Sequence, residues 1–209
     1  MSGIIAQNTL DNTGLIKSPE GGGAWNFIKK LTADGSGTAL TFVDGSSDVV
    51  LDSTYKVYSF TFNNIHPATN NAAFQLNFRD GGSSYDATKT TTLFKARHAE
   101  DDSSSEFGYE VAYDVAQDTG VAPLTESGIR NGNDDSLSGY MYLYDPSNTT
   151  FVKHFMATCQ YAGSTAAFTF NTYVAGYANV TAAIDGVQFS LSTGNMDLGD
   201  ICLYGLSDS

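Results

Sequence analysis

Apolar and polar residues alternate along most of the chain after residue 30, and this period of two is typical of β-strands with one buried face. Residues 107–115 carry the longest example, with an aromatic or Val residue at every second position. Turn sequences rich in Gly, Asn, Asp and Pro separate the alternating segments. The strands predicted on this basis cover residues 38–43, 55–62, 73–79, 107–115, 137–144, 151–161, 167–174, 187–192 and 201–206.

No segment shows the period of an amphipathic helix of ordinary length. Roughly eight to ten short strands at this spacing are typical of a sandwich or jelly roll. A chain of 209 residues is long enough for one β domain with its own core. We therefore predict an all-β fold, an antiparallel β-sandwich of the jelly-roll kind, over residues 31–209.

The first 30 residues differ from this body. Short apolar groups stand in a polar context, and a triple glycine precedes an aromatic cluster. We interpret residues 1–30 as an extended N-terminal arm that becomes ordered on a neighbouring subunit. Its candidate contact residues are Ile4, Ile5, Leu15, Ile16, Trp25, Phe27 and Ile28. The alternative is a flexible terminus whose Trp25 packs back onto its own domain.

The charge of the chain excludes several classes of partner. The formal net charge is −13, with 10 basic and 23 acidic residues, so no basic stripe is available for nucleic acid or for anionic lipid. No apolar run approaches the ~20 residues of a membrane span. Residues 1–7 lack the features of a secretory signal, so we expect synthesis in a cytoplasm. Only 16% of residues are charged, and surfaces of this kind are common in viral and extracellular assemblies.

The acidic and histidine residues do not form a catalytic pattern. Glu110 and Asp114 would lie on one strand face about 14 Å apart, which is too far for a retaining glycosidase pair. His66, His98 and His154 show no zinc-binding spacing. No nucleophile elbow is present either. We therefore predict that the protein is not an enzyme.

No cofactor is expected from the remaining candidate ligands. Cys159 and Cys202 fit neither a metal spacing nor a disulfide framework, and the strand parity of Cys159 predicts a buried free thiol. Residues 131–135, with the weaker 100–106, are the oxygen-rich segments that could hold Ca²⁺. They lack the regular ligand alternation of an EF-hand loop, so ordinary loops are favoured.

One strand carries a row of tyrosines on a single face: Tyr140, Tyr142 and Tyr144. The rings would be about 7 Å apart, which suits stacking on a saccharide. The same row would suit packing against a neighbouring subunit, where Tyr is enriched, and we favour this second use. Residues 55–62 are apolar on both strand faces, which predicts a self-association surface and a homo-oligomer, with a trimer as the first choice.

Four sequence patches resemble one family. They are the paired S-G-I-I and T-G-L-I at residues 2–5 and 13–16, F-N-N-I-H-P-A-T at 62–69, D-G-G-S-S-Y at 80–85, and the ending A-I-D-G-V-Q-F with G-N-M-D-L-G-D-I-C-L-Y-G-L between residues 183 and 206. In this order they resemble virion structural proteins of marine tailed bacteriophages, such as those infecting cyanobacteria. The family often has a Trp shortly before the final Ala-Ile, where this chain has Tyr173 or Tyr177.

The resemblance implies a structural protein of the virion with a jelly-roll-like body. The expected role is capsid decoration at the head surface, with neighbouring virion subunits bound through the N-terminal arm. The expected partners are other capsid or tail subunits and further copies of the chain. The alternative is a tail-fibre or receptor-binding module that recognises glycan on the host surface.

Overall fold

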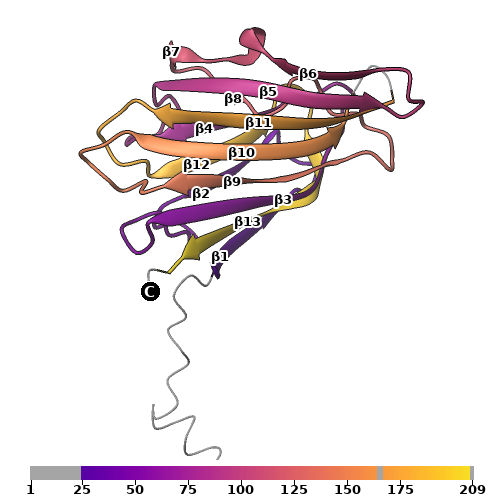
Figure 1. Cartoon of the computed structure of the whole chain (residues 1–209). Helices are drawn as coiled ribbons and strands as arrows, with labels where there is room; N and C mark the ends of the chain where they lie inside the picture. Colours follow the sequence, from indigo (N-terminus) through magenta and orange to yellow (C-terminus); the bar gives the residue numbers. More distant parts are fainter. Residues whose placement is uncertain (1–24, 164–166, 208–209) are drawn as a thin grey trace, which may run out of the picture.

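The computed structural model describes residues 25–163 and 167–207, and these form two antiparallel β-sheets that pack face to face (Figure 1). The described residues contain thirteen strands and one short 3₁₀ helix, η1 (Val111–Tyr113). The prediction of an all-β antiparallel sandwich is confirmed.

The larger sheet has nine strands and the smaller has four. The large sheet runs in the order β1 (Trp25–Thr32), β13 (Met196–Leu206), β3 (Val57–Pro67), β9 (Leu137–Tyr144), β10 (Lys153–Ala162), β11 (Phe168–Ala178), β5 (Lys89–Ala99) and β6 (Ser105–Tyr109), with β7 (Ala116–Asp118) also paired to β5. The small sheet runs in the order β2 (Ala39–Val43), β12 (Gly186–Leu191), β4 (Phe74–Arg79) and β8 (Ala122–Pro123). Neighbouring strands are mostly distant in sequence, so tertiary contacts hold the sheets together.

The core between the sheets is built around Phe189 of β12. Its ring lies 5.2 Å from Phe60 and 5.0 Å from Phe62, both on β3 of the opposite sheet. Phe74 of β4 stacks against the same ring at 5.8 Å. All four rings are buried, because strand alternation turns these positions toward the opposite sheet. Burying one such side chain contributes about 1.5–3 kcal/mol, so this cluster is a major source of stability.

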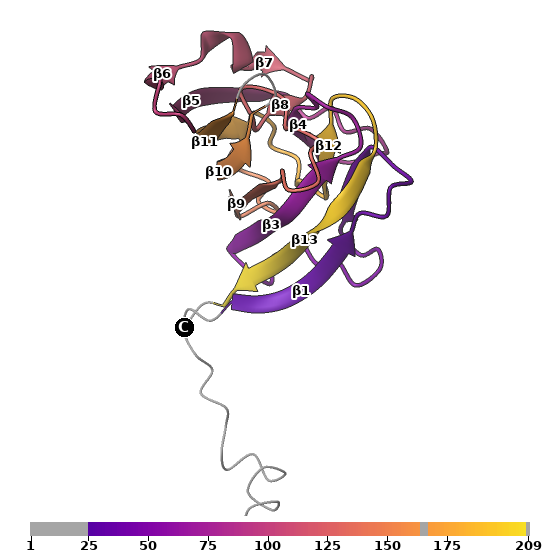
Figure 2. The same cartoon turned by 90° about the vertical axis from the view of Figure 1, so that its right-hand side faces the viewer.

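The first described strand is an edge strand of the large sheet, and it includes residues that the sequence assigned to the arm. Trp25 pairs with Leu206, so the start of β1 lies beside the end of β13 (Figure 2). Ile28 packs against the core. The interpretation of residues 25–30 as part of the arm is therefore wrong, and the alternative, in which Trp25 packs on its own domain, is confirmed. The other arm candidates, Ile4, Ile5, Leu15 and Ile16, lie outside the described residues.

Residues 107–115 do not form the single strand that their alternation predicts. β6 ends at Tyr109, and η1 follows at Val111. Phe107, Tyr109 and Val111 are exposed, because this segment crosses the sheet edge and no second sheet covers it. The prediction that Glu110 and Asp114 lie on one strand face is also wrong, since both follow the end of β6; Glu110 contacts a buried lysine and Asp114 accepts a hydrogen bond from the Leu93 N–H.

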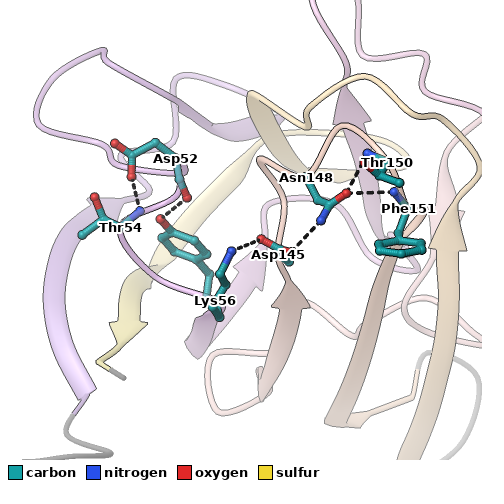
Figure 3. Close-up of polar contacts among 8 residues, drawn as sticks. Asp52, Thr54, Lys56, Asp145, Asn148, Thr150 and Phe151 are labelled. Atoms are coloured by element: carbon teal, nitrogen blue, oxygen red, sulfur yellow. Dashed lines mark hydrogen bonds and ion pairs between the residues drawn. The ribbon is translucent and has the colours of Figure 1, made fainter. Parts of the chain in front are cut away.

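The loop after β9 shows how polar residues end the strands, and Figure 3 draws these contacts. Asp145 directly follows β9, and its backbone φ is 46°. Its carboxylate forms an ion pair with the Lys56 ammonium group at 3.0 Å. The Asn148 Oδ1 atom accepts hydrogen bonds from the backbone N–H groups of Thr150 and Phe151, at 2.7 and 2.8 Å. Asn and Asp are favoured in turns because their side chains bind nearby backbone in this way. Residues 145–148 therefore form a turn, in which the Asn148 N–H donates to the Asp145 carbonyl at 3.0 Å.

Candidate functional site

The outer face of the large sheet carries most of the large apolar side chains that are exposed in the described residues. All described strands belong to the two sheets, so no further sheet covers this face. Of the twelve large apolar side chains that are exposed in the described residues, eight point to this side by strand parity. They are Trp25, Phe27, Phe94, Phe107, Tyr109, Tyr140, Met156 and Tyr173. Exposed apolar residues gathered on one face indicate a binding surface.

One part of this face forms a pocket of about 300 Å³ across β1, β13, β3 and β9. Its lining residues, which we name the Trp25 pocket, are Trp25, Ser59, Thr61, Tyr140, Tyr142 and Tyr204. The Trp25 ring stacks on Tyr142 with centroids 5.8 Å apart and planes 9° apart. Tyr140 lies against Tyr142 at 5.2 Å with an interplanar angle of 47°. The pocket therefore has aromatic walls from two strands that are not neighbours.

The floor of the Trp25 pocket carries hydroxyl groups. Ser59 lies opposite both Tyr142 and Tyr204 in the sheet, and Thr61 lies opposite Tyr140. Ser59 is only 5% exposed, and its side-chain hydroxyl has no hydrogen-bond partner among residues 25–163 and 167–207. Burial raises the pKa of Tyr204, so its phenol stays protonated and neutral near pH 7. The pocket thus combines apolar walls with neutral hydrogen-bonding groups.

A second aromatic group lies at the opposite side of the same face, on β11, β5 and β6. We name Phe94, Phe107, Tyr109 and Tyr173 the Phe94 patch. Phe94 stacks on Tyr173 with centroids 4.9 Å apart, and Phe107 meets Phe94 edge-on at 5.8 Å. Phe107 is 74% exposed, which is unusual for a phenylalanine that belongs to a strand. The rings are ordered against one another while their outer surface stays open.

A buried lysine holds the strand that carries the Phe94 patch. The Lys95 side chain on β5 is 5% exposed, and its Nζ atom lies 2.7 Å from Glu110 and 2.8 Å from Glu126. Burial alone would lower the pKa of Lys95, but the hydrogen bonds to Glu110 and Glu126 outweigh it and raise the pKa above its ordinary value. Lys95 therefore links the segment after β6 to the body of the sandwich.

Another cavity, of about 540 Å³, lies elsewhere, at the end of β3 that contains His66. His66 belongs to β3, and its Nδ1 and Nε2 atoms lie 2.7 Å from Asp197 and 3.1 Å from the Gly132 carbonyl. Burial lowers the pKa of His66, and the bonds to these two acceptors outweigh burial and raise it. Because both ring nitrogens face acceptors, this environment favours the protonated imidazole and leaves neither nitrogen directed at the cavity as a free proton acceptor.

The cavity does not provide a metal centre among the described residues. Asp135, from the segment with the best Ca²⁺ pattern, forms an ion pair with Arg130 at 3.1 Å. In the described ranges, no group of three or more His, Cys, Asp or Glu side chains is arranged to hold a metal ion. Cys159 is fully buried, and burial raises the pKa of its thiol, so the prediction of a buried free thiol is confirmed.

The structure brings together residues that the sequence proposed separately. Tyr140 and Tyr142, from the tyrosine row, meet Trp25, from the arm candidates, in one pocket. Tyr144 shares their face but is not part of the pocket lining, and Phe27 lies beside Tyr204 at 5.7 Å. Sequence reasoning missed Ser59, Thr61 and Tyr204. The alternation within β3 and β13 could have identified these three residues, because it places them on the strand face that points away from the buried residues.

The described residues contain no helix that is long and apolar enough to cross a membrane. Comparisons with protein-family models, with curated proteins and with solved structures find no match to this chain.

Proposed function

We propose that this chain is a structural protein of a tailed-phage virion, and specifically a decoration protein at the head surface. It binds neighbouring subunits through its N-terminal residues and through the Phe94 patch on the outer face of the large sheet. The order of the four sequence patches supports the virion class. The β-sandwich body agrees with that class, although the fold alone does not define a function.

The Phe94 patch is the observation that carries the assembly role. Its four side chains are aromatic, and Tyr and Phe are enriched in subunit interfaces while charged residues are depleted from their centres. Covering one such ring contributes about 1.5–3 kcal/mol, so even partial burial of the patch gives a useful contact energy. Lys95 holds the β6 side of the patch in place, which suits a surface that must be ready for a partner.

The test compares two exposed phenylalanines in the full-length protein. Phe107→Ser removes the most exposed ring of the patch, and Phe151→Ser removes a ring of similar exposure, 74% against 70%, from the loop before β10. We expect Phe107→Ser to lower incorporation into purified virions of the encoding phage and to weaken self-association in sedimentation. Phe151→Ser should behave like the wild type. Equal incorporation of both variants would refute an assembly role for the patch.

The N-terminal segment is tested separately by deleting residues 1–24. The described body begins at Trp25, so we expect the shortened protein to fold but not to be incorporated into particles. Normal incorporation would contradict anchoring by this segment. The expected homotrimer is tested by sedimentation equilibrium of the wild type, and a strictly monomeric profile at high concentration would contradict it.

The alternative function is that of a tail-fibre or receptor-binding module, and the Trp25 pocket is the one structural feature that supports it. Labelling of intact particles with an antibody against the body distinguishes the two roles. Signal over the head supports decoration, whereas signal confined to the tail tip supports receptor binding.

A further inference from the structure

We propose that the Trp25 pocket is a saccharide-binding site that accepts one neutral pyranose ring. The proposal concerns a binding property of the isolated protein. It does not depend on whether the chain is placed on a phage head, on a tail, or on neither.

The walls of the pocket suit the apolar face of a sugar. A pyranose presents one face of C–H groups, which packs against an aromatic ring as other apolar groups do. Trp25 is 43% exposed and Tyr140 is 42% exposed, so both rings keep free surface toward the pocket. Tyr142 lies between them and fixes both, since it stacks on Trp25 and contacts Tyr140. The platform is therefore formed before the ligand arrives, which lowers the entropic cost of binding.

The floor suits the hydroxyl groups on the edge of a sugar. Ser59 is more than nine-tenths buried, lines the pocket, and leaves its hydroxyl without a hydrogen-bond partner among the described residues. This hydroxyl is not one of the fully buried side-chain atoms without a partner, so it remains accessible from the pocket and can exchange hydrogen bonds with a ligand hydroxyl. Thr61 and the Tyr204 phenol stand next to Ser59 in the sheet and offer further donors and acceptors. A purely apolar ligand would leave these groups unsatisfied.

Charge narrows the class of sugar. None of the six lining residues is Asp, Glu, Lys, Arg or His. The whole chain carries a net charge of −13, so an anionic sugar is repelled at a distance and finds no cation in the pocket. A volume of about 300 Å³ is at the small end of ligand pockets, which suits one ring rather than a long chain. A neutral hexopyranose at the end of a glycan fits all three constraints.

The chain contains a single tryptophan, Trp25, so tryptophan fluorescence reports directly on this pocket. The full-length protein is titrated with methyl β-D-glucopyranoside, methyl β-D-galactopyranoside and methyl β-D-glucuronide, and saturation-transfer NMR maps which sugar protons lie on the protein. We expect saturable binding of at least one neutral glycoside. The dissociation constant should be on the order of 1 mM, as suits a ligand of about a dozen non-hydrogen atoms. The glucuronide should bind more weakly.

Variants assign the binding to the pocket. Tyr140→Ala should weaken binding roughly tenfold, and Ser59→Ala about threefold to tenfold, because each removes one stacking or hydrogen-bonding contact. Tyr109→Ala is the matched control, since it removes an exposed tyrosine from the same sheet face but from the Phe94 patch. The melting temperature of each variant is measured alongside, so that loss of binding is separated from loss of folding.

Several outcomes would overturn the proposal. The first is the absence of a fluorescence response to any neutral glycoside at about 50 mM. The second is an equal loss of glycoside affinity in Tyr109→Ala and Tyr140→Ala. The third is tighter binding of a proline-rich peptide than of either neutral glycoside, which would identify a peptide groove instead. A failure of saccharide binding is distinguishable from a failure of the assembly role. Tyr140→Ala should change sugar binding without changing incorporation into virions, and Phe107→Ser should do the reverse.

Discussion

Replacing Lys95 by methionine tests whether a buried ion cluster supports the Phe94 patch. The variant removes the cation and leaves Glu110 and Glu126 largely buried, with side chains that are 20% and 15% exposed. Breaking a buried ion pair from one side costs about 3–5 kcal/mol, because an uncompensated charge remains. We therefore expect Lys95→Met to lower the free energy of unfolding by about this amount.

The control is a surface pair of the same kind. Lys30 lies 3.4 Å from Asp200, and its side chain is 51% exposed. Exposed pairs contribute about 0.2–1 kcal/mol, so Lys30→Met should have a small effect. For a domain of this size, 1 kcal/mol shifts the melting temperature by roughly 2–4 °C. The two variants should therefore differ in melting temperature by about 4 °C or more.

The assay is urea unfolding followed by circular dichroism, together with amide hydrogen exchange over β6. Lys95→Met should increase exchange at Ser105–Tyr109 more than in the small sheet, because Glu110 directly follows this strand. Adding Glu126→Gln should recover part of the lost stability by removing one unpaired carboxylate. The raised pKa of Lys95 means that its contribution is fully present below about pH 10 and is lost as the pH rises through the folded pKa. Equal small effects of Lys95→Met and Lys30→Met would refute the reasoning.

Four further outcomes are expected. Phe189→Ala should cost about 3–5 kcal/mol in urea unfolding, whereas Phe151→Ala should change little, and similar values would contradict the assigned core. Because the pKa of His66 is raised in the folded state, its contribution to stability is fully present below about pH 6.5 and is lost as the pH rises through the folded pKa. The difference in melting temperature between the wild type and His66→Gln should therefore shrink as the pH rises, and a constant difference would argue against this contribution of His66. Asn148→Ala should cost about 1–2 kcal/mol in thermal unfolding, since two backbone N–H groups lose their acceptor, and an unchanged melting temperature would exclude that role. Cys159 should resist iodoacetamide in the native protein and react after unfolding, and rapid native labelling would show that its burial is wrong.

Some elements followed directly from local pattern. β9 was predicted with its observed bounds, because one side of that strand faces the core and its alternation of Leu and Met with Tyr is clear. β4 and β12 were found to within a residue or so for the same reason. In each case burial on one face and local alternation agree, so the sequence alone is sufficient.

The sequence pattern did not predict other elements, because in them the buried residues are polar or the apolar residues are exposed. The inward face of β5 carries Lys89, Thr91 and Lys95, so the strand lacks the expected apolar alternation although all three residues are buried. Residues 107–115 have that alternation but lie at the sheet edge, where no second sheet covers them. Polar groups inside and aromatic groups outside cannot be read from periodicity, because their environment depends on partners distant in the chain.

The sequence by itself determined the fold class, the positions of most strands and the tyrosine-rich face of β9. Only the tertiary structure decided that Trp25 belongs to an edge strand and stacks on Tyr142, 117 residues away in the chain, in a pocket that Ser59 also lines. The strand order β1-β13-β3-β9 produces that meeting. Antiparallel pairing between distant strands depends on how the two sheets bury their faces together, and no local pattern of residues contains that information.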